Sequence, residues 1–241
     1  GKSTLIENVR KVIKTNAKYS APVLITGETG TGKELAARGL HYSGIFVDSP
    51  FIAINCSTFT DELFASELFG YKKGAFTDAK SDKEGLISAA DGGSIFLDEI
   101  DSLSLKSQAA LLRLLQESEY RPVGSSQIKK SNVRVITAAN CNLHDRIKNG
   151  EFRQDLYFRL LILNVEMPPL RNIKEDIPLL MKFFINKFNK EYGLNRTGFS
   201  PELLHQFQRY NWPGNIRELE NKLHRYYLLT ESEIIHSNES T

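Results

Sequence analysis

The 241-residue sequence predicts an α/β protein, with a five-stranded parallel sheet flanked by helices and followed by a small helical lid. Up to Val165, short apolar runs alternate with stretches of helical periodicity, which is the pattern of successive βαβ units. Met167-Pro-Pro-Leu170 then marks a boundary, because paired prolines continue neither a helix nor a central strand. Beyond it the pattern is helical throughout. We therefore expect an α/β subdomain over 1–170 and a helical lid subdomain over 171–241.

The composition excludes several classes of protein. With 41% hydrophobic and 25% charged residues it is an ordinary globular chain, and a net charge of +2 does not by itself indicate a nucleic-acid or membrane surface. Cys56 and Cys141 are too few for a disulfide framework, and neither cysteines nor histidines show metal-ligand spacing. No signal peptide or long apolar span is evident, so we expect a cytoplasmic protein with no membrane partner.

The first chemical motif follows an amphipathic helix over Ser3–Ala17, for which Ser3 is the expected cap. A strand over Val23–Ile25 enters a glycine-rich turn, and a helix begins near Glu34 and runs to Tyr42. Two glycines with four residues between them, and a lysine directly after the second one, match a phosphate-binding loop, made of Gly27, Glu28, Thr29, Gly30, Thr31, Gly32 and Lys33. The glycines let successive amides point at one anion, and the lysine reaches the β- and γ-phosphates. The alternative is a strand-to-helix turn with no ligand.

Glu34 stands where this motif normally has the Ser or Thr that holds Mg²⁺. The next strand, Phe51–Ile54, ends at Asn55. Because ligands of open α/β sheets bind at the carboxyl ends of strands, Asn55 is a candidate contact for substrate or catalytic groups. Capping the following helix, expected over Asp61–Phe69, explains Asn55 equally well.

The segment 71–79 breaks the helical pattern and displays an aromatic residue, Phe76, in a polar loop. Surface loops often carry function, so we expect Phe76 to be an exposed contact residue; burial in the core is the alternative.

The strand Ser94–Leu97 delivers two adjacent carboxylates, Asp98 and Glu99, to the same edge of the sheet. In a P-loop ATPase such a pair has separate tasks: Asp98 holds Mg²⁺, directly or through water, and Glu99 polarises the attacking water. The alternative is a solvated acidic pair at a strand end. After a helix over Leu105–Glu117 and a hairpin or long loop over Glu119–Lys130, the strand Val133–Thr137 ends just before Asn140, a candidate sensor of the γ-phosphate.

Two arginines, Arg153 and Arg159, follow a short helix over Asn142–Asn149 and precede the fifth strand, Leu161–Val165. An arginine that reaches a neighbour's γ-phosphate stabilises transition-state charge, whereas a surface salt bridge is the common alternative for a single arginine. The lid is expected to contain helices over Ile177–Tyr192, from Pro201, and from Asn215, with Asn215 as the last helix's cap and Arg217 in its first turn.

Taken in order, these motifs resemble the central ATPase domain of bacterial sigma-54-dependent transcription activators (enhancer-binding proteins, the NtrC-like family), a branch of the AAA+ ATPases. The phosphate loop with its glutamate at 34, Glu67-Leu-Phe-Gly70, Gly74-Ala-Phe-Thr-Asp-Ala79 and Gly93-Ser-Ile-Phe-Leu-Asp-Glu-Ile100 all have counterparts there. So does Trp212-Pro-Gly-Asn-Ile-Arg217, the second sensor of the lid.

The resemblance implies an AAA+ P-loop NTPase that assembles as a ring, usually a hexamer, with ATP and Mg²⁺ bound between subunits. It implies roles for single residues as well: Asn55 restrains the catalytic Glu99, Asn140 is the first sensor, and Arg153 and Arg159 act on the neighbouring subunit's nucleotide. Arg217 contacts nucleotide within its own subunit, and Glu34 is a candidate metal ligand beside Asp98. Hydrolysis would move the contact loop, about 71–80, which grips sigma-54 through Gly74, Ala75, Phe76, Thr77, Asp78 and Ala79 and opens the closed polymerase–promoter complex.

The chain departs from the family pattern at Asp78, usually glycine, and at Ala139, commonly threonine. Aspartate tolerates a left-handed backbone, so the turn at Asp78 can survive. We expect an excised domain, in which the family's regulatory and helix-turn-helix domains have no counterpart, so promoter-upstream DNA would be contacted only through a domain absent from this chain.

Two other functions stay open from the sequence. One is a nucleotide-gated transcription regulator with little turnover, which the presence of Glu99, Arg153 and Arg159 disfavours. The other is an AAA+ remodeller of another partner, such as a DNA-helicase loader, which the Phe76 loop and the balanced charge disfavour.

Overall fold

The computed structural model describes residues 1–236, so the last five residues of the predicted lid, 237–241, lie outside the described residues. The chain forms two compact units. We call the first, Lys11–Thr26 with Lys33–Glu166, the α/β unit. The second, the lid unit, contains Gly1–Arg10, Gly27–Gly32 and the described chain from Met167 to His236. The phosphate loop is thus grouped with the lid, while Lys33, which ends its motif, belongs to the α/β unit.

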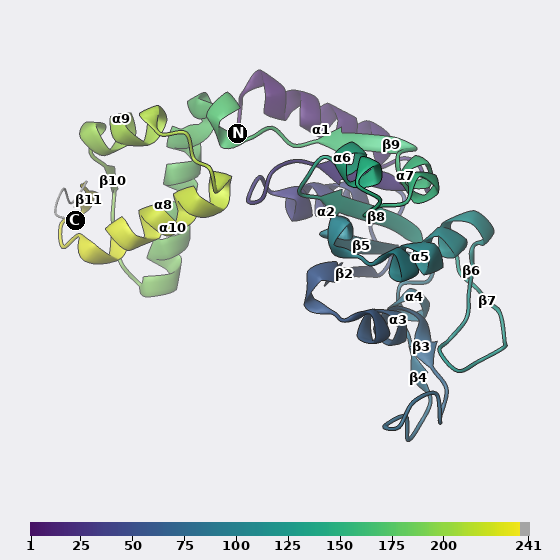
Figure 1. The fold of residues 1–241 in the computed structure, drawn as a ribbon. Coiled ribbons are helices and arrows are strands. Elements are labelled where there is room, and N and C mark those ends of the chain that lie inside the picture. The colour runs from purple at the N-terminus through teal and green to yellow at the C-terminus, as the bar shows by residue number, and fades with distance from the viewer. Residues whose placement is uncertain (237–241) are drawn as a thin grey trace. The chain divides into compact units, whose positions relative to one another are not determined.

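A five-stranded parallel sheet is the centre of the α/β unit, as the sequence predicted (Figure 1). Its strand order is β2-β5-β8-β1-β9, with the bounds β1 Val23–Thr26, β2 Phe51–Asn55, β5 Ser94–Asp98, β8 Arg134–Ala139 and β9 Leu163–Glu166. The register pairs Asn55 with Asp98 and Thr26 with Ala139, so the carboxyl ends of these four strands, three of which end at a polar residue, lie at one edge. The site described below is built on that edge.

Helices flank the sheet because β5 and β8 are apolar and buried along almost their whole length. Their core cluster includes Leu97, Ile100 and Leu111. The flanking elements are α1 Thr4–Asn16, which enters the unit from the lid unit, α2 Lys33–Tyr42, α3 Asp61–Phe69, α4 Leu86–Ala89, α5 Leu105–Glu117, α6 Leu143–Lys148 and α7 Gln154–Leu160, with 3-10 turns over Cys56–Thr58 and Ile100–Ser102. The expected helices over 61–69 and 105–117 are confirmed to the residue.

Two short antiparallel hairpins extend from the sheet, β3 Gly70–Tyr71 with β4 Lys83–Glu84, and β6 Glu119–Tyr120 with β7 Lys129–Lys130 (Figure 1). They are joined at Val123, which accepts a hydrogen bond from the Lys72 N–H at 3.0 Å and donates one to the Gly70 carbonyl at 2.8 Å. The loop that carries Phe76 therefore starts from a base supported by a second loop.

The lid unit packs around Trp212, which is fully buried and donates its indole N–H to the Phe207 carbonyl at 2.7 Å. Its elements are 3-10 turns over Leu170–Asn172 and Lys174–Asp176, helices α8 Ile177–Tyr192, α9 Pro201–Arg209 and α10 Asn215–Leu229, and strands β10 Gly198–Phe199 and β11 Ile234–Ile235. Ser200 caps α9 as expected, by accepting the Leu203 N–H.

Two expectations for this part of the chain were wrong. The purely helical reading missed the parallel pair β10–β11, whose strands of two residues are too short to show periodicity. Asn215 does not cap α10: Gly214 precedes the helix, and Asn215 has φ +54° with its side chain turned to other partners. A left-handed asparagine is tolerated because its short amide can hydrogen-bond locally.

Candidate functional site

Lys33 lies at the carboxyl edge of the sheet, at the first position of α2, and is buried. Its ammonium group donates to the Asn140 side-chain oxygen at 2.5 Å, and the Asn140 N–H donates to Asp101 Oδ1 at 3.1 Å. Two residues predicted from separate motifs, the phosphate-loop lysine and the sensor asparagine, are therefore in direct contact. The third member, Asp101, was missed by the sequence analysis, although it is the next acidic residue after the Asp98-Glu99 pair.

Asp98 is the last residue of β5, and Glu99 follows it directly. Burial raises the pKa of the Asp98 carboxyl above its ordinary value, and the charges of Glu99 and Glu34 add to the rise, while the Glu99 N–H and Lys33 oppose it. The backbone of Glu99 is left-handed at φ +54°, and its carbonyl accepts hydrogen bonds from the Ser102 N–H and hydroxyl at 2.9 and 2.7 Å. A non-glycine residue held in this region is uncommon and often marks a functional position.

Asn55 caps the turn that follows β2, because its side-chain oxygen accepts the Ser57 N–H at 2.9 Å and the Ser57 hydroxyl at 2.8 Å. Within residues 1–236 it makes no hydrogen bond to Glu99, so its restraint of Glu99 stays a prediction. Glu34, the second residue of α2, accepts hydrogen bonds from Nε and Nη2 of Arg38 at 3.0 and 2.8 Å.

Arg153 directly precedes α7 and Arg159 lies in its last turn, and the two side chains differ in their partners. Arg153 forms a two-bond ion pair with Asp155 at 3.0 and 2.7 Å, and its N–H donates to Gln108 Oε1 at 2.8 Å. Arg159 is exposed, and none of the described carboxylates forms a salt bridge with it. Gln108, fully buried on α5, also donates to the Leu103 and Glu151 carbonyls at 2.8 and 2.9 Å, so it positions the segment before α7.

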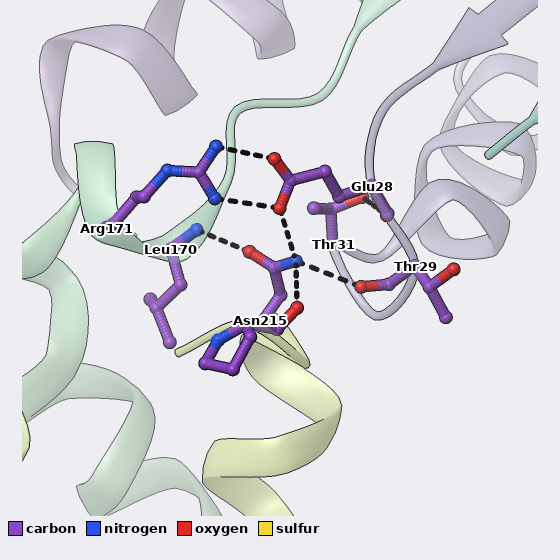
Figure 2. A network of polar contacts seen from close by, with 7 residues as sticks. Glu28, Thr29, Thr31, Leu170, Arg171 and Asn215 are labelled. Atoms are coloured by element: carbon purple, nitrogen blue, oxygen red, sulfur yellow. Dashed lines mark hydrogen bonds and ion pairs between the residues drawn. The ribbon is translucent and has the colours of Figure 1, made fainter. Parts of the chain in front are cut away.

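In the lid unit, the phosphate loop is hydrogen-bonded to the chain around Leu170 and to the start of α10 (Figure 2). Arg171 donates two hydrogen bonds to the Glu28 carboxylate, at 2.8 and 2.5 Å, and this pairing, followed by the Asn215 amide, lowers the pKa of Glu28 to about 2. Arg217 is exposed in the first turn of α10, and its Cβ lies 3.1 Å from where a side chain at Gly30 would begin. The sequence placed Glu28 in the phosphate loop but had no signal for Arg171 or for the role of Asn215.

The Phe76 loop runs from Lys72 to Asp82, and both ends are tied together. The Asp82 carboxylate accepts a hydrogen bond from the Lys72 ammonium group at 2.5 Å and one from the Lys73 N–H at 2.9 Å. These two bonds lower the pKa of the Asp82 carboxyl. Phe76 is 44% exposed, as expected for a contact residue, and meets the ring of Tyr71 edge-on with centroids 4.9 Å apart. Asp78 does not have a positive φ, so the tolerance of aspartate for left-handed backbone is not needed here.

A groove of about 480 Å³ lies beside Phe76 in the α/β unit. Phe76 and Ala75 form part of its wall, and the rest comes from α3, α5 and the second hairpin, through Asp61, Glu62, Leu63, Phe64, Ala65, Ser66, Lys106, Ser107, Ala110 and Val123. An aromatic side chain at the rim of such a groove gives the loop a larger apolar contact area than its tip alone.

The sheet order, the buried lysine at the start of α2 and the acidic pair at the end of β5 define an AAA+ P-loop NTPase fold with a C-terminal helical lid. Residues 1–166 match the family model of the sigma-54 interaction domain, and residues 171–239 match the AAA+ ATPase lid domain. This chain belongs to the sigma-54 interaction domain family, found in transcriptional regulatory proteins.

Several regulators are similar to it. XylR of Pseudomonas putida is 46% identical over 96% of this chain and 41% of its own length. ZraR of Escherichia coli K12 is 44% identical over 99% of this chain and 54% of its own length. The crystal structure of NtrX from Brucella abortus in complex with ATP superposes with a TM-score of 0.89, at 33% identity, over 95% of this chain and 50% of that one. The chain thus spans about half or less of the length of the regulators it matches.

None of the helices within residues 1–236 combines the length and apolar character that a membrane crossing requires.

Proposed function

We propose that this domain binds and hydrolyses ATP with Mg²⁺, assembles as a ring, and remodels the closed complex of RNA polymerase and sigma-54. The observation that supports this best is the Lys33–Asn140–Asp101 chain of contacts at the sheet edge that also carries Asp98 and Glu99. A lysine, an amide and two carboxylates at one edge are the groups that phosphoryl transfer to water requires.

Each of these side chains has a distinct task. Lys33 neutralises the β- and γ-phosphates, and its contact with Asn140 lets the amide sense whether the lysine is engaged with phosphate. Glu99 orients the attacking water or accepts a proton from it. Two hydrogen bonds from Ser102 to the Glu99 carbonyl fix the backbone from which this side chain extends. We propose the loop amides of Gly27–Gly32 and the Arg217 side chain as further phosphate contacts, because they belong to the phosphate-loop and second-sensor motifs.

The donor set fits Mg²⁺ that is shared with the nucleotide. No cluster of three or more metal-ligating His, Cys, Asp or Glu side chains occurs in the described residues. Mg²⁺ commonly takes one or two carboxylates plus substrate phosphates and water. Burial and the negative charges of Glu99 and Glu34 disfavour the ionised form of Asp98, so a bound cation would stabilise that form. Glu34 is the second candidate ligand. When bound, Mg²⁺ neutralises charge on the phosphate oxygens.

Ring assembly is proposed from Arg153 and Arg159. Arg159 has no carboxylate partner among the described residues and so is available for a neighbouring subunit's nucleotide. Arg153 has Asp155 as a competing partner in the isolated chain, and a γ-phosphate would have to displace it.

The partner-contact surface is the tip of the 71–80 loop with its exposed Phe76. Sigma-54 is proposed as the protein it grips, because the chain belongs to the sigma-54 interaction domain family. Gly74, Thr77 and Asp78 lie exposed on the same tip, and Ala75 and Ala79 support it.

The test is capture of purified sigma-54 by this domain with ADP and a metal-fluoride mimic of the transferring phosphoryl group. We expect a stable complex with the mimic and none with ADP alone, together with multiple-turnover release of phosphate from ATP. Phosphate release without capture would refute sigma-54 as the partner. Capture without turnover would instead support a nucleotide-gated regulator.

A further inference from the structure

Two carbonyl oxygens of the phosphate loop are held by donors at the start of α10. The Asn215 side-chain amide donates to the Thr29 carbonyl at 3.0 Å, and the Ile216 N–H donates to the Gly30 carbonyl at 3.0 Å (Figure 2 shows the first). Both bonds lie inside the lid unit. They are hydrogen bonds between main-chain groups of the loop and the N-terminal end of a lid helix.

Asn215 is itself fixed from several sides. It is fully buried, its Oδ1 accepts the Leu170 N–H at 2.8 Å, and its Nδ2 also donates to Glu28 Oε2 at 3.1 Å. Glu28 is in turn paired with Arg171. The amide is therefore oriented with its oxygen toward Leu170 and its nitrogen toward the loop, and it cannot be flipped without breaking three hydrogen bonds (Figure 2).

Holding a carbonyl also fixes the amide on its other side. A peptide unit is planar and trans, so its C=O and N–H point in opposite directions. When the Thr29 carbonyl is bound by Asn215, the Gly30 N–H must point away from Asn215. A Cβ at Gly30 would lie only 2.3 Å from the Gly214 carbonyl oxygen, so there is no room for a side chain. Gly30 also has φ +79°, a backbone conformation that favours glycine.

We propose that Asn215 is a positioning residue for the phosphate loop: it orients the Thr29–Gly30 peptide so that the Gly30 N–H faces the polyphosphate of a bound nucleotide. Glu28 and Arg171 hold the amide of Asn215 in the orientation that this requires. The affinity of the loop for phosphate then depends on its contact with the lid helix. This rests on the proposed binding of ATP, and it goes further by assigning the carboxylate of Glu28 to the lid rather than to nucleotide.

The experiment uses Asn215→Asp, which keeps the size of the side chain and its acceptor for Leu170 but replaces the donor to Thr29 and Glu28 by a carboxylate. Asn221→Asp is the matched control, because Asn221 is exposed on the same helix. The affinity for a fluorescent ADP analogue is measured for the full chain and both variants, after Trp212 fluorescence has shown a folded lid.

We expect Asn221→Asp to bind like the wild type and Asn215→Asp to bind about tenfold more weakly, the usual scale for one buried donor lost. Adding Glu28→Gln to Asn215→Asp should recover part of the loss, because the introduced amide can donate to the introduced carboxylate. A merely structural role of Asn215 predicts no such recovery. Hydrogen exchange of the segment 27–33 should be faster in Asn215→Asp and slower again in the double variant.

Binding of Asn215→Asp within twofold of the wild type, or no recovery in the double variant, would overturn the inference while leaving ATP binding intact. A wild-type chain that binds no ADP would overturn the proposed function and this inference together. If Asn215→Asp does not fold, Glu28→Gln alone decides, since this side chain is 42% exposed: about threefold weaker ADP binding supports the inference, and unchanged binding refutes it.

Discussion

Gln108 is a buried residue whose removal should affect both stability and the proposed catalytic arginine. Its side chain satisfies three main-chain groups: the Leu103 and Glu151 carbonyls and the Arg153 N–H. Gln108→Leu keeps most of the volume and removes all three bonds. A buried group left unsatisfied costs about 1–3 kcal/mol, with the low end for groups that water can reach.

The expected loss follows from where each group lies. The bond to Leu103 is buried, so it is assigned about 2 kcal/mol, and the two partly buried bonds are assigned about 1 kcal/mol each. The more apolar side chain offsets about 1 kcal/mol of the total, which leaves about 3 kcal/mol. In a chain of this size, that loss of stability corresponds to a midpoint of thermal unfolding lower by about 6–12 °C.

The assay is thermal and urea unfolding followed by far-ultraviolet circular dichroism, with the ATPase rate measured on the folded variant. Gln116→Leu is the control, because Gln116 is exposed on the same helix and should lose almost nothing. We also expect a lower ATPase rate from Gln108→Leu, since the main chain of Arg153 loses its anchor. A loss of stability within about 1 kcal/mol of the Gln116→Leu value would refute this reasoning.

Three further outcomes are expected. Although burial of Asp176 opposes its ionisation, hydrogen bonds from Ser3 and Lys2 lower the pKa of its carboxyl below the ordinary value of 3.8. The contribution of ionised Asp176 to the stability of the folded state is therefore complete above that value and is lost as the pH falls. The stability difference between wild type and Asp176→Asn, followed by Trp212 fluorescence, should therefore shrink from about pH 5 to about pH 3, and a constant difference would contradict the assignment. Phe76→Ala should abolish activation at a sigma-54 promoter and leave ATP hydrolysis nearly unchanged; loss of hydrolysis as well would show that the loop is not only a contact element. The ATPase rate per subunit should fall on dilution through ring assembly, and a constant rate would exclude arginines that act in trans.

The five-stranded sheet could be predicted because each strand is a compact apolar run that ends at a polar residue or a boundary. The edge positions of Asp98 and Asn140 followed directly from where those runs end. The long helices α5 and α8 were predictable to the residue, because their apolar periodicity is unbroken. The subdomain boundary after Leu170 and the roles of the site residues stay predictions.

What the sequence did not indicate depends on residues far apart in the chain. Asp101 is one acidic residue among many until β8 brings the Asn140 N–H beside it. Asn215 looked like a helix cap because asparagine favours that position, but its amide is used by Leu170 and the phosphate loop. No short-range pattern distinguishes those two uses of the same residue.

The junction at Val123 also bears on how such domains can diverge. The 121–128 loop carries an exposed Ile128, and Gly124 approaches Ala75 so closely that a Cβ would lie 2.6 Å from the Ala75 Cβ. Any side chain introduced at Gly124 would clash with Ala75 in the Phe76 loop. A substitution in the 121–128 loop, which contains none of the motif residues, would therefore change the conformation of the Phe76 loop, and a comparison of motifs alone would not detect it.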